Sequence, residues 1–254
     1  MKYYHKHMPG KSSLIAKGLI AFLPSGVKRF CYRHLFGYKI GKRVRIGISV
    51  IDAGECVIED DVSIGHFNLF VGTKKLRIGD HSRIGHLNIL RGGDEIDLGR
   101  YSEILRMNEI NSIPDPVVVN EVRPRFSLGD GSVVTTSHKI DFTDSVELGK
   151  MVVLGGRNSS LWTHNRQMTK PITIGDHSYI GSEIRIAPGG AIPPRCVVGI
   201  GSVITKEFSD PDRLIAGVPA KVIKKLDEDG KFLTEYKTRP DLPADIYSES
   251  SLVS

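Results

Sequence analysis

The sequence predicts an all-β protein whose main domain is a parallel β-helix of about eight coils, built from six-residue steps. The first observation is that isoleucine, leucine or valine recurs every six positions over long stretches, often followed by glycine. The second is the glycine content, because 27 glycines in 254 residues is high for a globular chain. A helix repeats every 3.6 residues and an ordinary strand every two, so neither explains this spacing.

The clearest stretch of the repeat lies in the C-terminal half. Its members, six residues apart, are Ile174, Ile180, Ile186, Ile192, Val198 and Ile204. Upstream, pairs of aliphatic residues six apart begin at positions 40, 58, 78, 98, 128 and 148, and the last two pairs begin at 174 and 192. The intervals between starts are 18, 20, 20, 30, 20, 26 and 18 residues. Three six-residue faces make a triangular coil of 18, with the small residue after each aliphatic letting the backbone turn. The intervals of 30 and 26 therefore predict inserted loops.

The chain divides into a helical cap at 1–37, the β-helix at 38–207, and a C-terminal segment and tail at 208–254. An amphipathic helix is expected in the first segment, with Ser25 as N-cap and Gly37 as its stop. Its apolar stripe consists of Val27, Phe30, Cys31, His34 and Leu35. This basic helix either covers the open first coil or makes a peripheral contact with a membrane.

Charge and cysteine content narrow the function classes. The net charge of +6 is modest, and no nucleic-acid-binding motif is present, so no nucleic-acid partner is expected. Three widely spaced cysteines form no disulfide framework, which indicates a reducing compartment: the cytoplasm, with the inner face of the membrane as an alternative. No run of roughly 18 apolar residues and no signal peptide is found. The polar tail after residue 226 is expected to be an extended arm, ordered at most by a neighbouring subunit.

At these repeats the chain resembles the hexapeptide-repeat acyltransferases, which are left-handed parallel β-helices. The resemblance covers roughly residues 38–226. It includes the closing segment Ala216-Gly217-Val218-Pro219-Ala220-Lys221, which is similar to the segment that ends the family's helix. It implies a left-handed coil, acetyl-CoA as acyl donor without a metal, and a homotrimer with sites between neighbouring subunits.

His164 is the leading catalytic candidate, in the interruption at 155–171. The string Leu161-Trp162-Thr163-His164-Asn165 resembles the family's catalytic Thr-His loop. The resemblance implies that a neutral imidazole takes the proton of an acceptor hydroxyl or amine, which then attacks the thioester. The string from Ser137 through His138 to Asp141 is similar to one in the polysaccharide-modifying acetyltransferases, although here the serine is adjacent to the histidine. Asp141 could orient a histidine; the alternatives are a surface-loop His164 and a structural corner network for His138 and Asp141.

Binding residues are predicted around these candidates. The acceptor candidates in the same interruption are Asn158, Ser159, Trp162 and Arg166. Trp162 either stacks on a sugar ring or anchors the loop. The other insertion, 107–126, is expected to help shape the acceptor pocket and holds Glu109, Asn111, Pro114, Asp115 and Pro116. Small residues of the last coils would leave room for the pantetheine arm of acetyl-CoA; these are Gly181, Ala187, Gly199 and Ser202. Lys206 and Lys221 would either neutralise the phosphates of acetyl-CoA or be solvated surface groups.

The favoured hypothesis is an acetyl-CoA-dependent O-acetyltransferase that modifies a sugar hydroxyl of a glycan or polysaccharide precursor. Alternatives are another hydroxyl or amine acceptor, a non-catalytic β-helix scaffold, and a zinc enzyme like the carbonic anhydrases of this fold. The zinc alternative would use His66, His81 and His86. Repetition alone predicts that His66 stacks on His86, and Asn68 on Asn88, because near-identical strings recur 20 residues apart.

Overall fold

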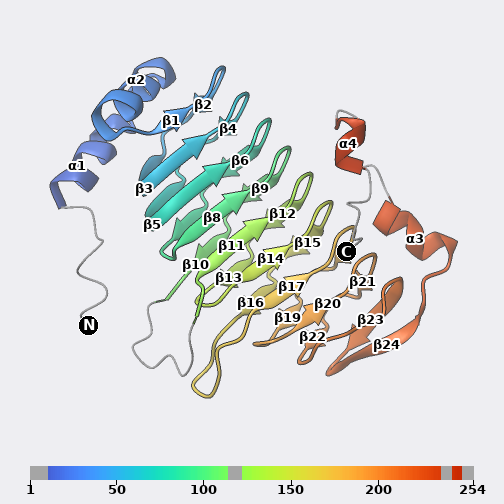
Figure 1. Ribbon diagram of the computed structural model, residues 1–254. Helices are drawn as coiled ribbons and strands as arrows, with labels where there is room; N and C mark the ends of the chain where they lie inside the picture. The colour runs from blue at the N-terminus through green and yellow to red at the C-terminus, as the bar shows by residue number, and fades with distance from the viewer. Residues whose placement is uncertain (1–10, 114–121, 236–241, 248–254) are drawn as a thin grey trace.

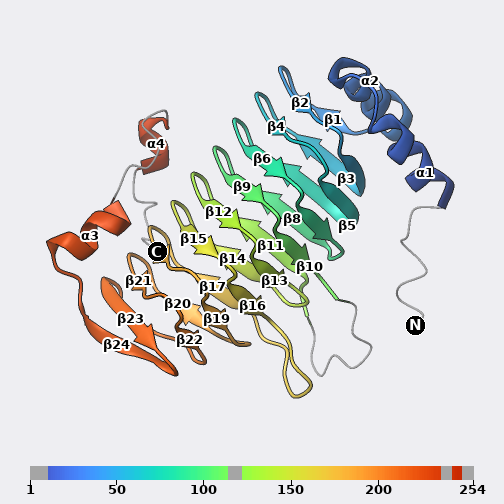
Figure 2. The ribbon, with the colours of Figure 1, turned by 180° about the vertical axis from the view of Figure 1, so that it is seen from behind.

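The computed structural model describes residues 11–113, 122–235 and 242–247. These residues form a left-handed parallel β-helix of about eight coils, flanked by helices at both ends (Figure 1). The predicted fold class is therefore confirmed. Three rows of short parallel strands run along the rod, and the chain crosses from row to row at three corners (Figure 2).

Each row is a ladder of strands from successive coils. The first row contains β1 (Lys39–Ile40), β8 (Glu95–Leu98), β11 (Arg125–Leu128), β14 (Val146–Leu148), β17 (Ile172–Ile174) and β20 (Ala191–Ile192). The second row contains β2 (Arg45–Ile46), β4 (Ser63–Ile64), β6 (Arg83–His86), β9 (Glu103–Arg106), β12 (Val133–Thr136), β15 (Val153–Arg157), β18 (Tyr179–Ile180), β21 (Val197–Val198) and β23 (Arg213–Gly217). The third row contains β7 (Ile89–Arg91), β10 (Glu109–Asn111), β13 (Lys139–Asp141), β16 (Ser160–Trp162), β19 (Arg185–Ile186) and β22 (Val203–Ile204). Two long strands, β3 (Val50–Ile58) and β5 (Leu69–Ile78), bend so that they belong to both the third and the first row.

The first, second and third corners follow the first, second and third rows, respectively. In-register pairing places like residues on like, as Ile58 pairs with Ile78 and Ile64 with Ile84. The aliphatic positions predicted from the six-residue spacing are all buried in one continuous core. The third row adds members that the spacing missed upstream: Ile51, Phe70, Leu90, Ile110, Ile140 and Leu161.

The glycines act differently from the expectation. Gly65 and Gly85 do not have positive φ angles, and the left-handed turns fall on other residues, such as His81 at φ 58°. A Cβ on Gly65 would instead collide with the carbonyl oxygen of Gly85 in the next coil. The glycines that follow the aliphatic residues of the repeat, such as Gly65 and Gly85, are thus required where neighbouring coils approach closely, rather than for turning the backbone.

The N-terminal segment does cover the first coil, but with the face opposite to the predicted one. It consists of α1 (Lys11–Ile20) and α2 (Ser25–Phe36), and Gly37 ends α2 in the left-handed conformation as expected. The hydroxyl of Ser25 accepts a hydrogen bond from the Ile46 N–H, so the expected N-cap role is wrong. The buried residues of α2 are Lys28 and Tyr32, whereas most of the predicted apolar stripe is exposed.

A buried ion pair fixes α1 to the coil. Lys17 Nζ lies 2.5 Å from Asp52 Oδ1, and both side chains are almost inaccessible. Burial alone would lower the pKa of Lys17, but hydrogen bonds with Asp52 and Tyr38 outweigh this and raise it. Lys17 therefore stays charged, and α1 cannot leave the coil without separating Lys17 from Asp52 in a poorly solvated site.

The C-terminal segment packs on its own chain. After β23, the antiparallel β24 (Ala220–Lys225) closes the β-helix, followed by α3 (Glu228–Glu235) and α4 (Ala244–Tyr247). Leu242 and Ile246 are buried against Met151, and Asp245 pairs with Arg100 at 2.8 Å. The expectation of an extended arm is wrong for these residues. Among the described residues, no helix is both long and apolar enough to span a bilayer. The three cysteines are unpaired.

Candidate active site

The third corner carries both insertions. They are narrower than predicted, covering 112–124 after β10 and 163–171 after β16, because the flanking residues belong to regular strands. Glu109 and Asn111 therefore lie on β10, while Pro114, Asp115 and Pro116 are outside the described residues. One regular corner, at 142–145, lies between the insertions, and Figure 1 shows the 163–171 loop projecting from this edge.

Asp141, the last residue of β13, is the centre of a hydrogen-bond network at this corner. Its Oδ1 accepts from the Thr143 N–H at 3.2 Å and from the Thr143 hydroxyl at 2.7 Å. Its Oδ2 accepts from the Thr163 N–H at 3.2 Å and from the Thr163 hydroxyl at 3.1 Å. Four donors from two coils thus fix the orientation of one buried carboxylate.

His164 makes the fifth contact with this carboxylate. Its Nδ1 lies 2.6 Å from Asp141 Oδ2. Because the carboxylate accepts, Nδ1 carries the hydrogen and Nε2 presents its lone pair. Within 11–113, 122–235 and 242–247, no hydrogen bond engages Nε2, and the side chain is 17% exposed. This is the arrangement of a histidine that can accept a proton from a group in solvent.

The backbone of the 163–171 loop holds His164 in place. His164 and Thr169 form an antiparallel bridge at the base of the loop. At the tip, the side-chain oxygen of Asn165 accepts two backbone N–H groups at 2.8 and 2.9 Å. The interruption is therefore a small closed hairpin, and Asp141 fixes the imidazole ring from the neighbouring coil.

His138 lies in a different environment. It is fully buried at the second corner, where its Nδ1 accepts from the Ser159 N–H at 3.1 Å and its Nε2 lies 3.0 Å from the Thr135 hydroxyl. Burial lowers the pKa of His138 to about 4, so the ring is neutral near pH 7. Its place is one rung of a stacked polar ladder formed by Ser49, Asn68, Asn88, Asn108, His138 and Ser159. With both ring nitrogens bound internally, the geometry favours the structural alternative over a catalytic role.

The acceptor candidates separate into two groups. Trp162 is exposed, pairs in register with Asp141, and lies two residues before His164; Arg166 is exposed in the same hairpin. Ser159 is fully buried and its hydroxyl accepts from the Ile184 N–H, so an acceptor cannot reach it. Asn158 is exposed, but at the second corner, on the other side of β16.

The cofactor candidates do not lie along one line. Gly181, Gly199 and Ser202 are at the second corner, Ala187 and Lys206 at the third, and Lys221 on β24. Ser202 is fully buried; its hydroxyl donates to the Gly199 carbonyl at 2.6 Å and accepts from the Gly217 N–H. It is therefore a structural residue, which corrects the expectation that it contacts the cofactor. Both lysines are exposed.

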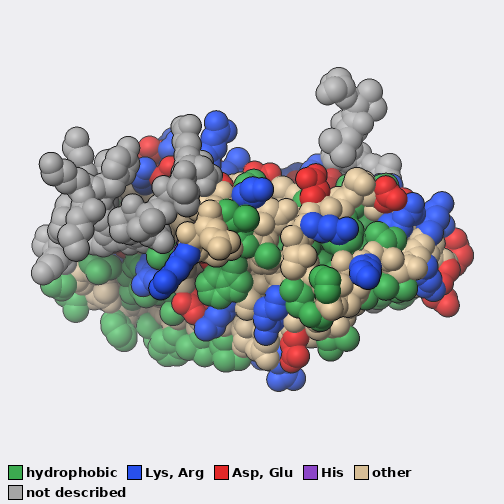
Figure 3. Space-filling model, turned by 90° about the horizontal axis from the view of Figure 1, so that it is seen from below, with side chains coloured by type: hydrophobic (Ala, Val, Ile, Leu, Met, Phe, Trp, Pro, Cys, Tyr) green, Lys and Arg blue, Asp and Glu red, His purple; other side chains and the backbone are tan. Residues whose placement is uncertain are grey.

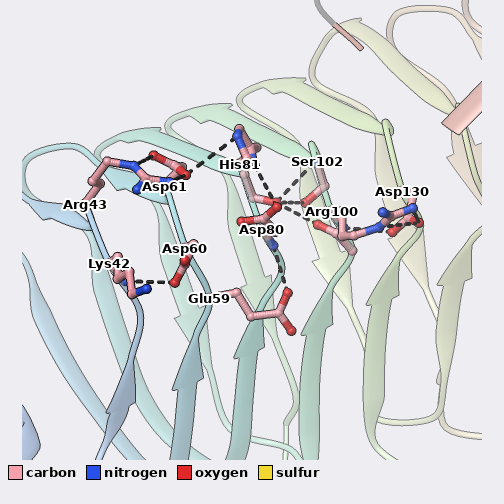
Figure 4. Close-up of polar contacts among 12 residues, drawn as sticks. Lys42, Arg43, Glu59, Asp60, Asp61, Asp80, His81, Arg100, Ser102 and Asp130 are labelled. Atoms are coloured by element: carbon pink, nitrogen blue, oxygen red, sulfur yellow. Dashed lines mark hydrogen bonds and ion pairs between the residues drawn. The ribbon is translucent and has the colours of Figure 1, made fainter. Parts of the chain in front are cut away.

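A carboxylate cluster at the first corner is the one grouping of possible metal ligands in the described part of the chain. Asp61, Asp80 and His81 lie close together (Figure 4). However, Arg43 already forms a two-point ion pair with Asp61. His81 Nδ1 lies 2.7 Å from Asp80, and its ring stacks on Tyr101. The cluster is better described as a ladder of ion pairs between coils.

The structure does not support the zinc alternative. His66 and His86 stack with ring centroids 5.6 Å apart, as the repeat predicts, and Asn68 bonds to Asn88. The Nδ1 atoms of His66 and His86 accept backbone N–H groups from the preceding coil. His81 is at the first corner and these two are at the second, so the three imidazoles do not converge.

Thr143 is the residue that sequence reasoning missed. Its N–H and hydroxyl both donate to Asp141, and its hydroxyl also bonds to the backbone of Ile113, at the start of the first insertion. The available signal was the local string Asp141-Phe142-Thr143, since aspartate commonly bonds to the backbone two residues ahead.

Comparison with known proteins agrees with the repeat and the fold. No protein-family model matches the chain. Galactoside O-acetyltransferase of Escherichia coli (strain K12) is 41% identical over 69 residues, which are 26% of this chain and 34% of that protein. The match thus spans about a third of that relative's length. The UDP-N-acetylglucosamine acyltransferase of Campylobacter jejuni superimposes with a TM-score of 0.58 at 19% identity, covering 77% of this chain and 76% of that one.

The structure is a rod of stacked six-residue steps with a histidine hairpin at one edge. In its repeat and its left-handed β-helix the chain is similar to the hexapeptide-repeat acyltransferases.

Proposed function

We propose that the chain is an acetyl-CoA-dependent O-acetyltransferase acting on a sugar hydroxyl of a glycan or polysaccharide precursor. One observation carries the proposal: the hydrogen bond of 2.6 Å between His164 and Asp141 at an interruption of an otherwise regular coil. It leaves one imidazole nitrogen available at the surface, next to Trp162, whose exposed ring can stack on a sugar.

In the proposed reaction, His164 Nε2 takes the proton of the acceptor hydroxyl. The freed oxygen attacks the thioester carbonyl, and the C–O bond forms as the C–S bond breaks. The imidazolium returns its proton to the departing coenzyme A thiolate, so no group of the protein is acylated. Asp141 stabilises the imidazolium and keeps the ring in the tautomer that exposes Nε2.

Thr143 and Thr163 are positioning residues in this proposal. Each gives two hydrogen bonds to Asp141, one from its backbone and one from its hydroxyl. Because Thr163 precedes His164 and Thr143 borders the first insertion, the network couples both loops to the orientation of the imidazole.

The choice of donor and acceptor rests on the relatives. The Escherichia coli relative is a galactoside O-acetyltransferase, so acetyl transfer to a sugar oxygen is the reaction of a protein that shares part of this sequence. The acetyl-CoA donor and a homotrimer with its sites between subunits follow from the family resemblance. Of the cofactor candidates, Gly181, Ala187, Gly199, Lys206 and Lys221 stay in the proposal.

The test is thiol release from acetyl-CoA with a panel of sugar acceptors, followed by mass spectrometry of the product. We expect acceptor-dependent thiol release and a product heavier by one acetyl group on oxygen. Release with amines alone would refute the sugar hydroxyl but keep the transferase. No acetyl transfer to any acceptor would refute the proposal. Light scattering of the same sample should give the mass of three chains, and a monomer would refute the trimer.

A further inference from the structure

The two N-terminal helices expose apolar side chains and bury charged ones. Lys17 of α1 is paired with Asp52, and Lys28 of α2 bonds to the carbonyls of Ile46 and Gly47 in the first coil. The outer faces of these helices and the turn between them carry exposed apolar side chains: Ile15, Leu19, Phe22, Val27, Phe30 and Leu35. Burying lysine and exposing leucine and phenylalanine costs free energy when only water surrounds the helices. These helices therefore indicate an apolar partner.

The apolar face continues from α1 onto the rod. A groove of about 460 Å³ between α1 and the second corner is lined mainly by apolar side chains, among them Ile15, Leu19, Phe22 and Phe67. From there, one exposed apolar tip per coil follows at intervals of 20 residues: Phe67, Leu87 and Met107. Figure 3 shows hydrophobic side chains gathered along one edge of the molecule, at the end that holds the N-terminal helices.

The later coils show that the fold does not require apolar tips. The equivalent positions further along the second corner are Ser137, Asn158, Glu183 and Gly201. All seven tips have positive φ, a conformation that bulky apolar residues adopt reluctantly. At this positive-φ position apolar residues therefore occur only in the coils nearest α1, which indicates a surface rather than a rule of the repeat.

The charge distribution identifies the kind of partner. Residues 1–51 contain eleven Lys and Arg and no Asp or Glu. The rest of the chain has 24 Lys and Arg against 29 Asp and Glu, a net charge of −5. Exposed Lys39, Lys42 and Arg45 belong to the basic part. An apolar face in a basic segment is the combination that binds anionic lipid surfaces.

We propose that α1, α2 and the apolar tips Phe67, Leu87 and Met107 bind the surface of an anionic phospholipid bilayer. A second copy of the chain fits less well, because a two-fold contact would place one basic segment against another. The proposal stands independently of the proposed acetyl transfer, since it uses none of the residues at the third corner.

The test is co-sedimentation of the full chain with vesicles of phosphatidylcholine alone or mixed with phosphatidylglycerol. We expect binding to the mixed vesicles, weakened by added salt. The double variant Leu19→Gln/Phe22→Gln should bind at least tenfold more weakly, because both exposed side chains lose their insertion. Ile200→Gln is the matched control: Ile200 is 74% exposed, against 70% and 75% for Leu19 and Phe22, but lies near the other end of the rod. It should bind like the wild type.

Unfolding temperature checks that each variant is folded, which the exposure of the changed residues favours. Equal binding by the wild type and the double variant would overturn the proposal. An absence of binding to the mixed vesicles would overturn it too. If in that case Leu19→Gln/Phe22→Gln converted a dimer of the chain into a monomer, the apolar face would be an interface between two copies. Binding to phosphatidylcholine alone with the same strength would overturn the anionic part.

Discussion

Two histidines one coil apart show how the same side chain acquires different properties in the same solenoid. His138 is at the second corner, where each coil repeats the previous one and stacked polar side chains satisfy one another. His164 is at the third corner, where the coil is interrupted. Ser159 of the ladder and the Thr135 hydroxyl engage both nitrogens of His138, whereas among the described residues only Nδ1 of His164 is engaged, by Asp141.

The two histidines show that polar side chains stacked in regular coils are already hydrogen-bonded to one another. In the stacked ladder each buried polar side chain bonds to its counterpart in the next coil, so these side chains have no hydrogen bond left for a ligand. An insertion removes that counterpart on one side. Reactive groups in this fold are therefore expected where a loop replaces a corner, and the following predictions examine that difference.

The largest effect is expected for His164→Asn. Loss of the proton acceptor should lower kcat by roughly 10²- to 10⁴-fold. The matched control is His177→Asn, because His177 has a positive φ of 57° that asparagine tolerates, at the first corner. Steady-state thiol release should show His177→Asn within about twofold of the wild type. Full turnover by His164→Asn would remove the distinction between the two histidines.

A substitution of His138 should change the free energy of unfolding rather than kcat. Its pKa is about 4 in the folded chain and 6.5 as a free side chain, so the unfolded chain binds more protons between these values. Stability is therefore retained above pH 6.5 and is lost as the pH falls towards 4, by up to about 3 kcal/mol. His138→Asn would continue the ladder of Asn68, Asn88 and Asn108 and should flatten this slope while keeping acetyl transfer.

Urea unfolding at several pH values measures the His138 contribution. The wild type and His138→Asn should have similar stability near neutral pH and diverge in acid, where only the wild type has to protonate the buried ring. An unchanged acid slope in His138→Asn, or a loss of turnover as large as that of His164→Asn, would contradict the structural role.

The loss of kcat in Asp141→Asn should be smaller than that in His164→Asn and larger than that in His138→Asn. The amide cannot accept as a carboxylate does, so the imidazole loses the partner that keeps hydrogen on Nδ1. We expect kcat to fall roughly ten- to a hundredfold with little change in KM. Asp97→Asn is a surface carboxylate control, paired with Arg77 on the first row. If Asp141→Asn and Asp97→Asn behaved alike, the buried carboxylate would have no part in catalysis.

The spacing of isoleucines, leucines and valines predicts the parallel coils, because each coil must place an aliphatic side chain at the same depth, whereas the left-handed sense was expected only from the family resemblance. The same logic predicted the stacking of His66 on His86. It did not predict why glycine is needed at these positions. The close approach of Gly65 to Gly85 depends on the distance between neighbouring coils, which the spacing along the sequence does not give. The interruption was found as a break in the period, and His164 with it.

Side-chain direction at the corners could not be obtained from spacing alone. Ser159 and Ser202 are predicted to contact ligands, yet both hydroxyls are buried and bond to backbone groups of the chain. The buried face of α2 was also misassigned, because its apolar stripe suggested a core and the structure buries Lys28 on backbone carbonyls instead. Contacts with other parts of the fold determine which way these side chains point, and the spacing of residues along the sequence does not indicate those contacts.

The smallest effect expected is that of Thr143→Val, which keeps the volume and removes one donor to Asp141. Loss of one hydrogen bond of about 1 kcal/mol should lower kcat about fivefold. Because Thr143 acts through Asp141, KM should stay constant, and Thr143→Ser should restore kcat by returning the hydroxyl. Thr173→Val, on the exposed face of β17, is the control for a general effect of the substitution. A rise in KM at constant kcat would assign Thr143 to acceptor binding instead, and equal kcat for Thr143→Val and Thr143→Ser would show that the hydroxyl does not position the carboxylate.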